Sequence, residues 1–149
     1  MNDDFLDLLK CLLEAGARFL VVGAHALAVH GIPRATGALD LWIDRDPANV
    51  ERVWAALLSF GAPVAALGVR RGDLEAAAMT VQIGLPPRRI DLLTEITGVP
   101  FDEAWNSRVV RPVDALEVPF IGRQELVRNK RALGRPKDLA DLEALGENK

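Results

Sequence analysis

Residues 18–43 of the chain are RFLVVGAHALAVHGIPRATGALDLWI, and this stretch decides the fold. It begins with a short apolar run that ends at Gly23, which is typical of a buried strand. The segment 24–30 is predicted to be a helix, because the break at Gly31-Ile32-Pro33 ends it. Residues 39–43 alternate strictly, which predicts a second strand with two different faces. A strand, a short helix and another strand therefore follow one another directly.

The remaining segments predict a single α/β (α+β) domain, 1–149, in which a small mixed β-sheet is flanked by helices. The chain has no internal repeat, low-complexity tract or linker. A helical tail covers about residues 122–145 and is broken at Gly134-Arg135-Pro136. Helices are predicted at 4–16, 47–60, 101–106, 123–133 and 138–145, helical turns at 72–78, strands at 79–83, 88–93, 109–110 and 118–121, and a turn at 112–114.

Composition limits the class of protein. Of the 149 residues, 50% are apolar and 26% are charged, so the chain is able to bury a core. No apolar run reaches the roughly 18 residues of a membrane helix. The first residues are acidic and lack the basic region of a secretory signal. Cys11 is the only cysteine, so no internal disulfide can form, and this favours a cytoplasmic protein. Its side chain is expected in the core. The net charge of −3 does not indicate nucleic-acid binding, although the excess of Lys and Arg in 122–137 suits either phosphates or solvent.

Two acidic residues, Asp40 and Asp91, stand on predicted strands that are otherwise apolar. Alternation places Asp40 on the same strand face as position 38, and Asp91 on the outward face of a later strand. A carboxylate in an apolar setting is costly unless it meets a metal, a cation or water. The spacing of Asp40 from Gly23 and the presence of a second acid favour the metal, so we interpret both as metal ligands. The alternatives are an exposed strand face for Asp40 and an ion pair with Arg88 or Arg89 for Asp91.

Gly23 and Ala24 join the first strand to the helix that follows it. A strand that ends in glycine and opens into a helix presents free backbone N–H groups at the helix N-terminus. These groups and the helix dipole favour a phosphate, so Gly23 and Ala24 are predicted to contact a phosphate-bearing ligand.

Several motifs of the chain together cover nearly its whole length. They are VGAHA at 22–26, GIPRAT at 31–36, LDLW at 39–42, RIDLL at 89–93, NKRA at 129–132, GRPKD at 134–138 and DL at 141–142. With these motifs the chain resembles the minimal nucleotidyltransferases of the polymerase-β superfamily. More closely, it resembles the bacterial group that includes nucleotidyltransferase-type toxins of toxin–antitoxin pairs.

The resemblance implies a nucleotidyltransferase fold and the Mg²⁺-dependent transfer of a nucleoside monophosphate from an NTP to a hydroxyl group. The implied acceptor is a tRNA end or a protein side chain, and the implied partner is a cognate antitoxin; Mn²⁺ is an implied substitute for Mg²⁺. In this family three carboxylates hold two metal ions, of which one activates the attacking oxygen and the other steadies the triphosphate. Asp40 and Asp91 match the second and third of these acids.

Two positions depart from the family pattern. Ala24 stands where Gly or Ser is expected, which removes a hydroxyl group but keeps the backbone N–H. Ala38 stands where the first catalytic acid is expected, so metal and nucleotide binding should be weakened together and activity reduced or lost. A deliberate inactivation and a natural loss both fit Ala38. The rival interpretation is a non-catalytic nucleotide- or partner-binding module, such as a component of a toxin–antitoxin pair.

Four further residues are candidate nucleotide contacts. Arg34 and Thr36 lie in the loop that enters the acidic strand, where they either touch phosphate or the neighbouring acids, or pack the loop. The resemblance places Lys130 and Lys137 near the cleft, as contacts of the triphosphate. The alternative for each is a solvated surface lysine.

Other conspicuous side chains are assigned structural roles. His25 and His30 are five residues apart on a short helix, so their side chains diverge by roughly 140° and suit packing or capping better than zinc binding. Trp42 shares the face of Asp40 and either stacks on a base or lies at a partly buried edge of the core. Asp138 is expected to cap the last helix.

Overall fold

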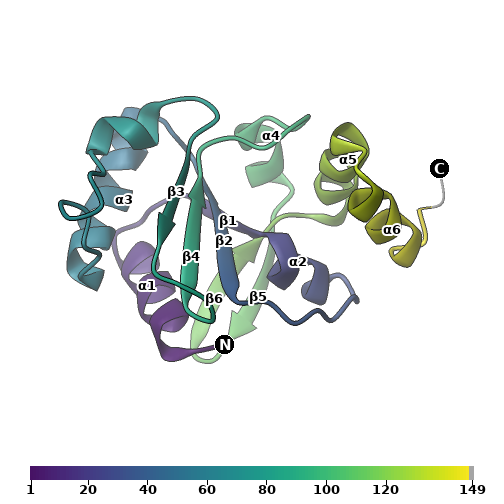
Figure 1. Ribbon diagram of the computed structural model, residues 1–149, viewed down its shortest axis with the longest axis horizontal. Helices are drawn as coiled ribbons and strands as arrows, with labels where there is room; N and C mark the ends of the chain where they lie inside the picture. Colours follow the sequence, from purple (N-terminus) through teal and green to yellow (C-terminus); the bar gives the residue numbers. More distant parts are fainter. Residues whose placement is uncertain (148–149) are drawn as a thin grey trace.

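The computed structural model describes residues 1–147, and this range contains six α-helices, one 3₁₀-helix and six strands (Figure 1). The mixed α/β content and the C-terminal pair of helices confirm the predicted fold class. In chain order the elements are α1 (Asp3–Glu14), β1 (Phe19–Val22), α2 (Gly23–Val29), β2 (Ala38–Ile43), α3 (Pro47–Phe60), η1 (Arg71–Glu75), β3 (Thr80–Ile83), β4 (Arg89–Leu93), α4 (Phe101–Asn106), β5 (Val109–Val113), β6 (Leu116–Phe120), α5 (Arg123–Leu133) and α6 (Pro136–Ala144).

The six described strands form one mixed sheet in the order β3-β4-β2-β1-β6-β5. β1 pairs antiparallel with β2 and parallel with β6, while β2 pairs parallel with β4. β3 and β5 are the edge strands and run antiparallel to their neighbours. The strands that carry Asp40 and Asp91 are therefore direct neighbours, although β4 follows β2 only after a helix, a 3₁₀-helix and an edge strand.

Helices cover both faces of the sheet: Figure 1 shows α1 and α3 on one side and α2, α5 and α6 on the other. For this reason all four residues of β1 are buried, as expected of a strand covered on both faces. The residues that α1 buries are spaced as one apolar helix face. They are Phe5, Leu8, Leu9 and Leu12, each at most 3% exposed.

The predicted bounds of α3, α4 and α5 agree with the observed ones, whereas the turn predicted at 112–114 begins two residues later. Pro112 and Val113 lie in β5, and the chain turns at Asp114 and Ala115, with φ of 52° at Asp114. Pro112 is tolerated in β5 because this strand has a partner on one side only, so a residue without an N–H group is accommodated there.

The last helix begins at Pro136, two residues before its predicted start. Asp138 is the third residue of α6, and its Oδ2 accepts a hydrogen bond of 3.2 Å from the backbone N–H of Arg135. Asp138 therefore caps the helix as expected, but it does so from inside the first turn rather than from the position before it.

The burial of Cys11 and the character of the helices bear on two expectations from composition. Cys11 is half-buried and packs against the core from α1, so it is less enclosed than expected. Within residues 1–147, no helix combines the length and the apolar character needed to cross a membrane.

Candidate functional site

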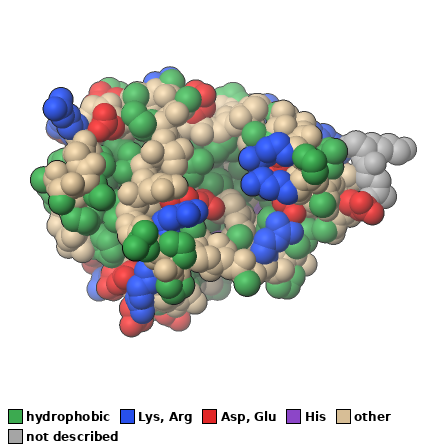
Figure 2. All heavy atoms as spheres, viewed as in Figure 1, with side chains coloured by type: hydrophobic (Ala, Val, Ile, Leu, Met, Phe, Trp, Pro, Cys, Tyr) green, Lys and Arg blue, Asp and Glu red, His purple; other side chains and the backbone are tan. Residues whose placement is uncertain are grey.

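A cavity of about 630 Å³ lies between the sheet and the C-terminal helices. Figure 2 shows this hollowed face, with Lys and Arg side chains gathered over α5 and α6 opposite acidic side chains over the sheet. Most of the candidate residues line the cavity, whereas Thr36 and Ala38 are absent from its wall. The candidates in the wall are Gly23, Ala24, Arg34, Asp40, Asp91, Lys130 and Lys137.

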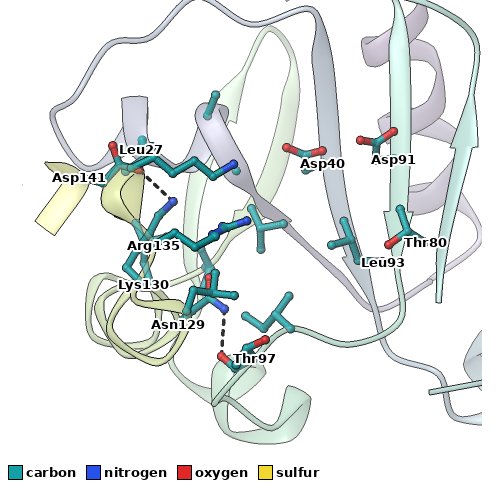
Figure 3. A pocket seen from close by; sticks show the side chains of 18 of the residues that line it. Leu27, Asp40, Thr80, Asp91, Leu93, Thr97, Asn129, Lys130, Arg135 and Asp141 are labelled. Atoms are coloured by element: carbon teal, nitrogen blue, oxygen red, sulfur yellow. Dashed lines mark hydrogen bonds and ion pairs between the residues drawn. The ribbon is translucent and has the colours of Figure 1, made fainter. Parts of the chain in front are cut away.

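The two acids lie side by side on the sheet wall of the cavity. Asp40 of β2 and Asp91 of β4 are partners in the parallel register, so their side chains leave the sheet on the same face. Figure 3 shows both carboxylates directed to the same side, opposite Lys130 and Arg135. Asp91 is only 7% exposed, and Asp40 is half-buried. The structure therefore brings together the two acids whose outward phase the sequence predicted.

Gly23 allows the close approach of Asp40 to the backbone. Its φ is +70°, a conformation that other residues rarely adopt. A Cβ atom at Gly23 would lie only 2.1 Å from Oδ2 of Asp40, which is impossible without displacing the carboxylate. The glycine at the start of α2 thus serves the placement of an acid as well as the turn itself.

The pKa of Asp40 is raised from its ordinary value of 3.8 to about 6. Burial is the largest cause, followed by the negative charge of Asp91 and a hydrogen bond between the two carboxyl groups. The positive charges of Arg89 and Lys130 act in the opposite direction but are outweighed. Burial and Asp91 therefore disfavour the charged form of Asp40, and a cation close to this carboxylate would stabilise it.

Replacing Asp40 with asparagine is expected to stabilise the metal-free protein near neutral pH. The folded protein holds the Asp40 proton more tightly than the unfolded chain, so the wild type loses stability as the pH rises from about 4 through 6. Above this range, Asp40→Asn should increase the free energy of unfolding by about 1–2 kcal/mol, a value reduced for partial exposure to solvent. Below about pH 4 the difference should disappear.

Urea denaturation in EDTA at several pH values measures this effect. Asp7→Asn, which changes an exposed acid on α1, is the matched control and should change the free energy of unfolding by less than about 0.5 kcal/mol. A difference between Asp40→Asn and the wild type that is constant across the pH range would contradict the expected coupling.

Arg89 forms an ion pair with Asp91 on the cavity wall, which is one of the two alternatives left open by the sequence. Its Nη2 donates a hydrogen bond of 3.2 Å to Oδ2 of Asp91. Its Nε lies 3.2 Å from Oδ1 of the same carboxylate, but without hydrogen-bond geometry, so both of these buried atoms have no hydrogen-bond partner. Arg88 instead pairs with Asp4 at 3.2 Å. The i, i+2 spacing of Arg89 and Asp91 on one strand is the sequence signal for this contact.

Ala38 and Thr36 lie at the entry to β2, outside the cavity wall. Ala38 is 6% exposed, and its register partner on β4 is Arg89. The hydroxyl of Thr36 donates a hydrogen bond of 3.1 Å to the carbonyl oxygen of Ala38, and the N–H of Ala38 donates one of 3.2 Å back to this hydroxyl. Thr36 therefore fastens the loop to the strand, which is the structural alternative stated for it.

The acid pair suits one hard divalent cation. Mg²⁺ commonly binds through one or two carboxylates together with phosphate oxygens, and Mn²⁺ accepts the same ligands. Oδ1 of Asp91 is buried without a hydrogen-bond donor, so it has a lone pair to offer. Within residues 1–147, no group of three or more His, Cys, Asp or Glu side chains is placed to hold a metal.

The opposite wall carries basic side chains that acids hold in place. Lys130 on α5 is 13% exposed, and its Nζ lies 2.9 Å from Oδ2 of Asp141 and 3.4 Å from Oδ1 of Asp138. Arg34 reaches the same Asp141 at 2.7 Å, so the loop before β2 is tied to α6. Lys130 is therefore not a solvated surface lysine, and that alternative is wrong for it. Lys137 is exposed at the cavity.

Sequence reasoning missed Arg135, which also lines the cavity. Its Nε donates a hydrogen bond of 2.6 Å to Oδ2 of Asp138, within one turn of α6. Asn129, part of a quoted motif but given no role, lines the cavity as well and donates from Nδ2 to the carbonyl oxygen of Thr97 at 2.9 Å. The clustering of Asn, Lys and Arg in 129–137 was the available signal for both.

The histidines and Trp42 have structural roles. His30 contacts the carbonyl oxygen of Ile121 through Nε2 at 2.8 Å, and His25 packs edge-on against Phe5 with ring centroids 6.0 Å apart. Trp42 is 1% exposed and packs edge-on against Phe101 at 5.1 Å. Stacking of Trp42 on a base is therefore wrong, because α4 covers this end of the strand face.

Comparison with known protein families finds no family model that matches the chain, and comparison with curated proteins finds no matching relative.

Proposed function

We propose that the cavity binds a nucleoside triphosphate together with Mg²⁺, and that the protein is a nucleotidyltransferase-type enzyme whose chemical step is impaired at Ala38. The observation that supports this most is the facing of an acid pair and a basic wall across one cavity of about 630 Å³. This volume is within the range of small-molecule sites. The acceptor in this proposal is a hydroxyl group of a tRNA end or a protein side chain.

The two walls would serve different parts of the nucleotide. Asp40 and Asp91 would hold the ion, for which Mn²⁺ is a substitute, and Gly23 leaves room for the Asp40 carboxylate beside the backbone. A bound Mg²⁺ neutralises charge on phosphate oxygens and orients them for in-line displacement. Lys130, Arg135 and Lys137 offer N–H donors to the remaining phosphate oxygens from the side of the C-terminal helices.

A missing carboxylate at position 38 would limit catalysis more than binding. The methyl group of Ala38 offers no oxygen ligand, so a second divalent ion lacks one of the acids that would balance its charge. The nucleotide phosphates supply the other ligands of a single ion, so Mg²⁺–NTP binding is retained at reduced affinity.

A second candidate function is a non-catalytic nucleotide- or partner-binding module of a toxin–antitoxin pair. The ion pair between Arg89 and Asp91 favours it, because one of the two remaining acids already has a cation. Calorimetric titration of the full chain with each Mg²⁺–NTP separates nucleotide binding from protein contact alone. Transfer of labelled NMP in a cell extract separates the enzyme from a silent binder.

Replacing Lys137 with alanine is expected to weaken the affinity for Mg²⁺–NTP by about tenfold, the size of one lost charge-assisted hydrogen bond. The melting temperature should remain unchanged, because this lysine is exposed. Lys130→Ala should instead lower both nucleotide affinity and melting temperature, because Asp138 and Asp141 are buried and lose a cation.

Titration calorimetry and thermal melting of the same samples measure the two effects. Lys10→Ala, an exposed lysine on α1 at the other face of the sheet, is the matched control and should change neither quantity. Unchanged nucleotide affinity in both Lys130→Ala and Lys137→Ala would remove the basic wall from the proposed site.

A further inference from the structure

We propose that Arg89 is a built-in cation of the acid pair: it competes with a divalent ion for Asp91, because Ala38, its neighbour on β2, offers it no other carboxylate. The inference rests on the proposed function only in taking Asp40 and Asp91 as a cation site. In this inference Arg89 limits the binding of a metal ion, whereas the sequence indicated only an ion pair between Arg89 and Asp91.

The register of the sheet carries this inference. In the parallel pair of β2 and β4, Ala38 is opposite Arg89 and Asp40 is opposite Asp91. Residues two apart on a strand share a face, so all four side chains leave the sheet on the same side. On this face the guanidinium reaches along β4 to Asp91, with a hydrogen bond of 3.2 Å to Oδ2 and a separation of 3.2 Å from Nε to Oδ1.

The guanidinium of Arg89 and a divalent ion bound to Asp91 would carry like charges close together. The guanidinium of Arg89 is a cation whose charge acts on Asp40, and it forms an ion pair with Asp91. A divalent ion bound to Asp91 would lie a few ångströms from the guanidinium, where like charges in a partly buried site repel strongly. Metal binding must therefore displace Arg89 or be weakened by it.

Ala38 explains why the arginine is free to settle on Asp91. The adjacent strands are about 5 Å apart, so a side chain at position 38 stands directly beside that of Arg89. An aspartate there would offer Arg89 a second carboxylate and would draw the guanidinium away from Asp91. A methyl group offers no such partner, and within residues 1–147 Asp91 is the acid with which Arg89 forms its ion pair.

Direct Mn²⁺ binding to the full chain tests the competition without any need for activity or nucleotide. The electron paramagnetic resonance signal of free Mn²⁺ gives the affinity of the wild type and of Arg89→Met. We expect Arg89→Met to bind Mn²⁺ at least about tenfold more tightly, because the repulsion between the guanidinium and the ion is removed. Asp91→Asn in the Arg89→Met background should remove this gain. Arg88→Met is the matched control, because Arg88 pairs with Asp4 away from the acid pair.

Two further variants keep the test decisive if Arg89→Met is poorly folded. Arg89→Gln keeps hydrogen-bond donors but removes the charge, and it should bind Mn²⁺ more tightly than the wild type. Arg89→Lys keeps the positive charge, so this variant should bind Mn²⁺ weakly. Unchanged Mn²⁺ affinity in both Arg89→Met and Arg89→Gln would overturn the inference.

The proposed function fails by a different result. If neither the wild type nor Ala38→Asp binds any Mg²⁺–NTP, the nucleotide site is wrong, whereas a gain of Mn²⁺ affinity in Arg89→Met would still support the competition. Conversely, nucleotide binding by Ala38→Asp with no effect of Arg89 on Mn²⁺ would support the function and refute the role of Arg89.

Discussion

Replacing Ala38 with aspartate is expected to tighten Mg²⁺–NTP binding by about tenfold or more and to produce transfer of labelled NMP to tRNA or protein in a cell extract. The new carboxylate would leave β2 on the same face as Asp40, beside the acid pair, and would complete a set of three acids for two ions. Titration calorimetry with each NTP measures binding, and gel analysis of labelled acceptors measures transfer.

The variant should also become dependent on Mg²⁺ for stability. Position 38 is 6% exposed, so an aspartate there is largely removed from water and needs a cation, either Arg89 or a metal ion. The melting temperature of Ala38→Asp should therefore lie below that of the wild type in EDTA and rise with Mg²⁺, whereas the wild type should respond less.

Two controls separate charge from shape in this experiment. Ala38→Asn has nearly the same size as Ala38→Asp but no charge, and it should gain neither affinity nor transfer. Asp40→Asn in the Ala38→Asp background should abolish the gain, because a ligand of the metal is lost. If Ala38→Asp remains inactive with all four NTPs and a broad acceptor pool, the enzyme proposal fails and the binding module replaces it.

Replacing Asp138 with alanine is expected to lower the free energy of unfolding by about 3 kcal/mol. Asp138 is 0% exposed and accepts hydrogen bonds from Arg135 at 2.6 Å and from Lys130 at 3.4 Å. Its loss removes the cap of α6 and leaves the half-buried ammonium of Lys130 with one acidic partner instead of two. Urea denaturation near neutral pH measures the change.

The effect should depend on pH in a defined direction. The hydrogen bond from Arg135 holds the pKa of Asp138 below its ordinary value of 3.8, so the folded protein releases this proton more easily than the unfolded chain. The stabilisation by Asp138 is therefore present above about pH 4 and is lost as the pH falls below it, where the difference between Asp138→Ala and the wild type should shrink.

Asp102→Ala is the control for loss of an acid at the surface. Its side chain is 86% exposed and lies 3.9 Å from Arg18, so the change should alter stability by less than about 0.5 kcal/mol. If Asp138→Ala lowers the free energy of unfolding no more than Asp102→Ala does, the contacts of Asp138 with Arg135 and Lys130 do not hold the two C-terminal helices together.

The sequence by itself determined the elements and the phase of the acids. Glycine and proline breaks and apolar periodicity act within a few residues, so the bounds of α3, α4 and α5 could be predicted without knowledge of the rest of the chain. Alternation along a strand likewise sets which face Asp40 and Asp91 share with their own neighbours. Pro112 was misjudged because its tolerance in β5 depends on that strand's place at the sheet edge.

Only the tertiary structure decided which distant side chains share the site. The pairing of β2 with β4 placed Arg89 beside Ala38, and the packing of α5 against α6 enclosed Lys130 between two carboxylates. Phe101 of α4 covered Trp42 and so excluded it from the cavity. The physical reason is that burial and the pairing of charges depend on groups brought together by folding from remote parts of the chain. Local periodicity contains no information about such neighbours.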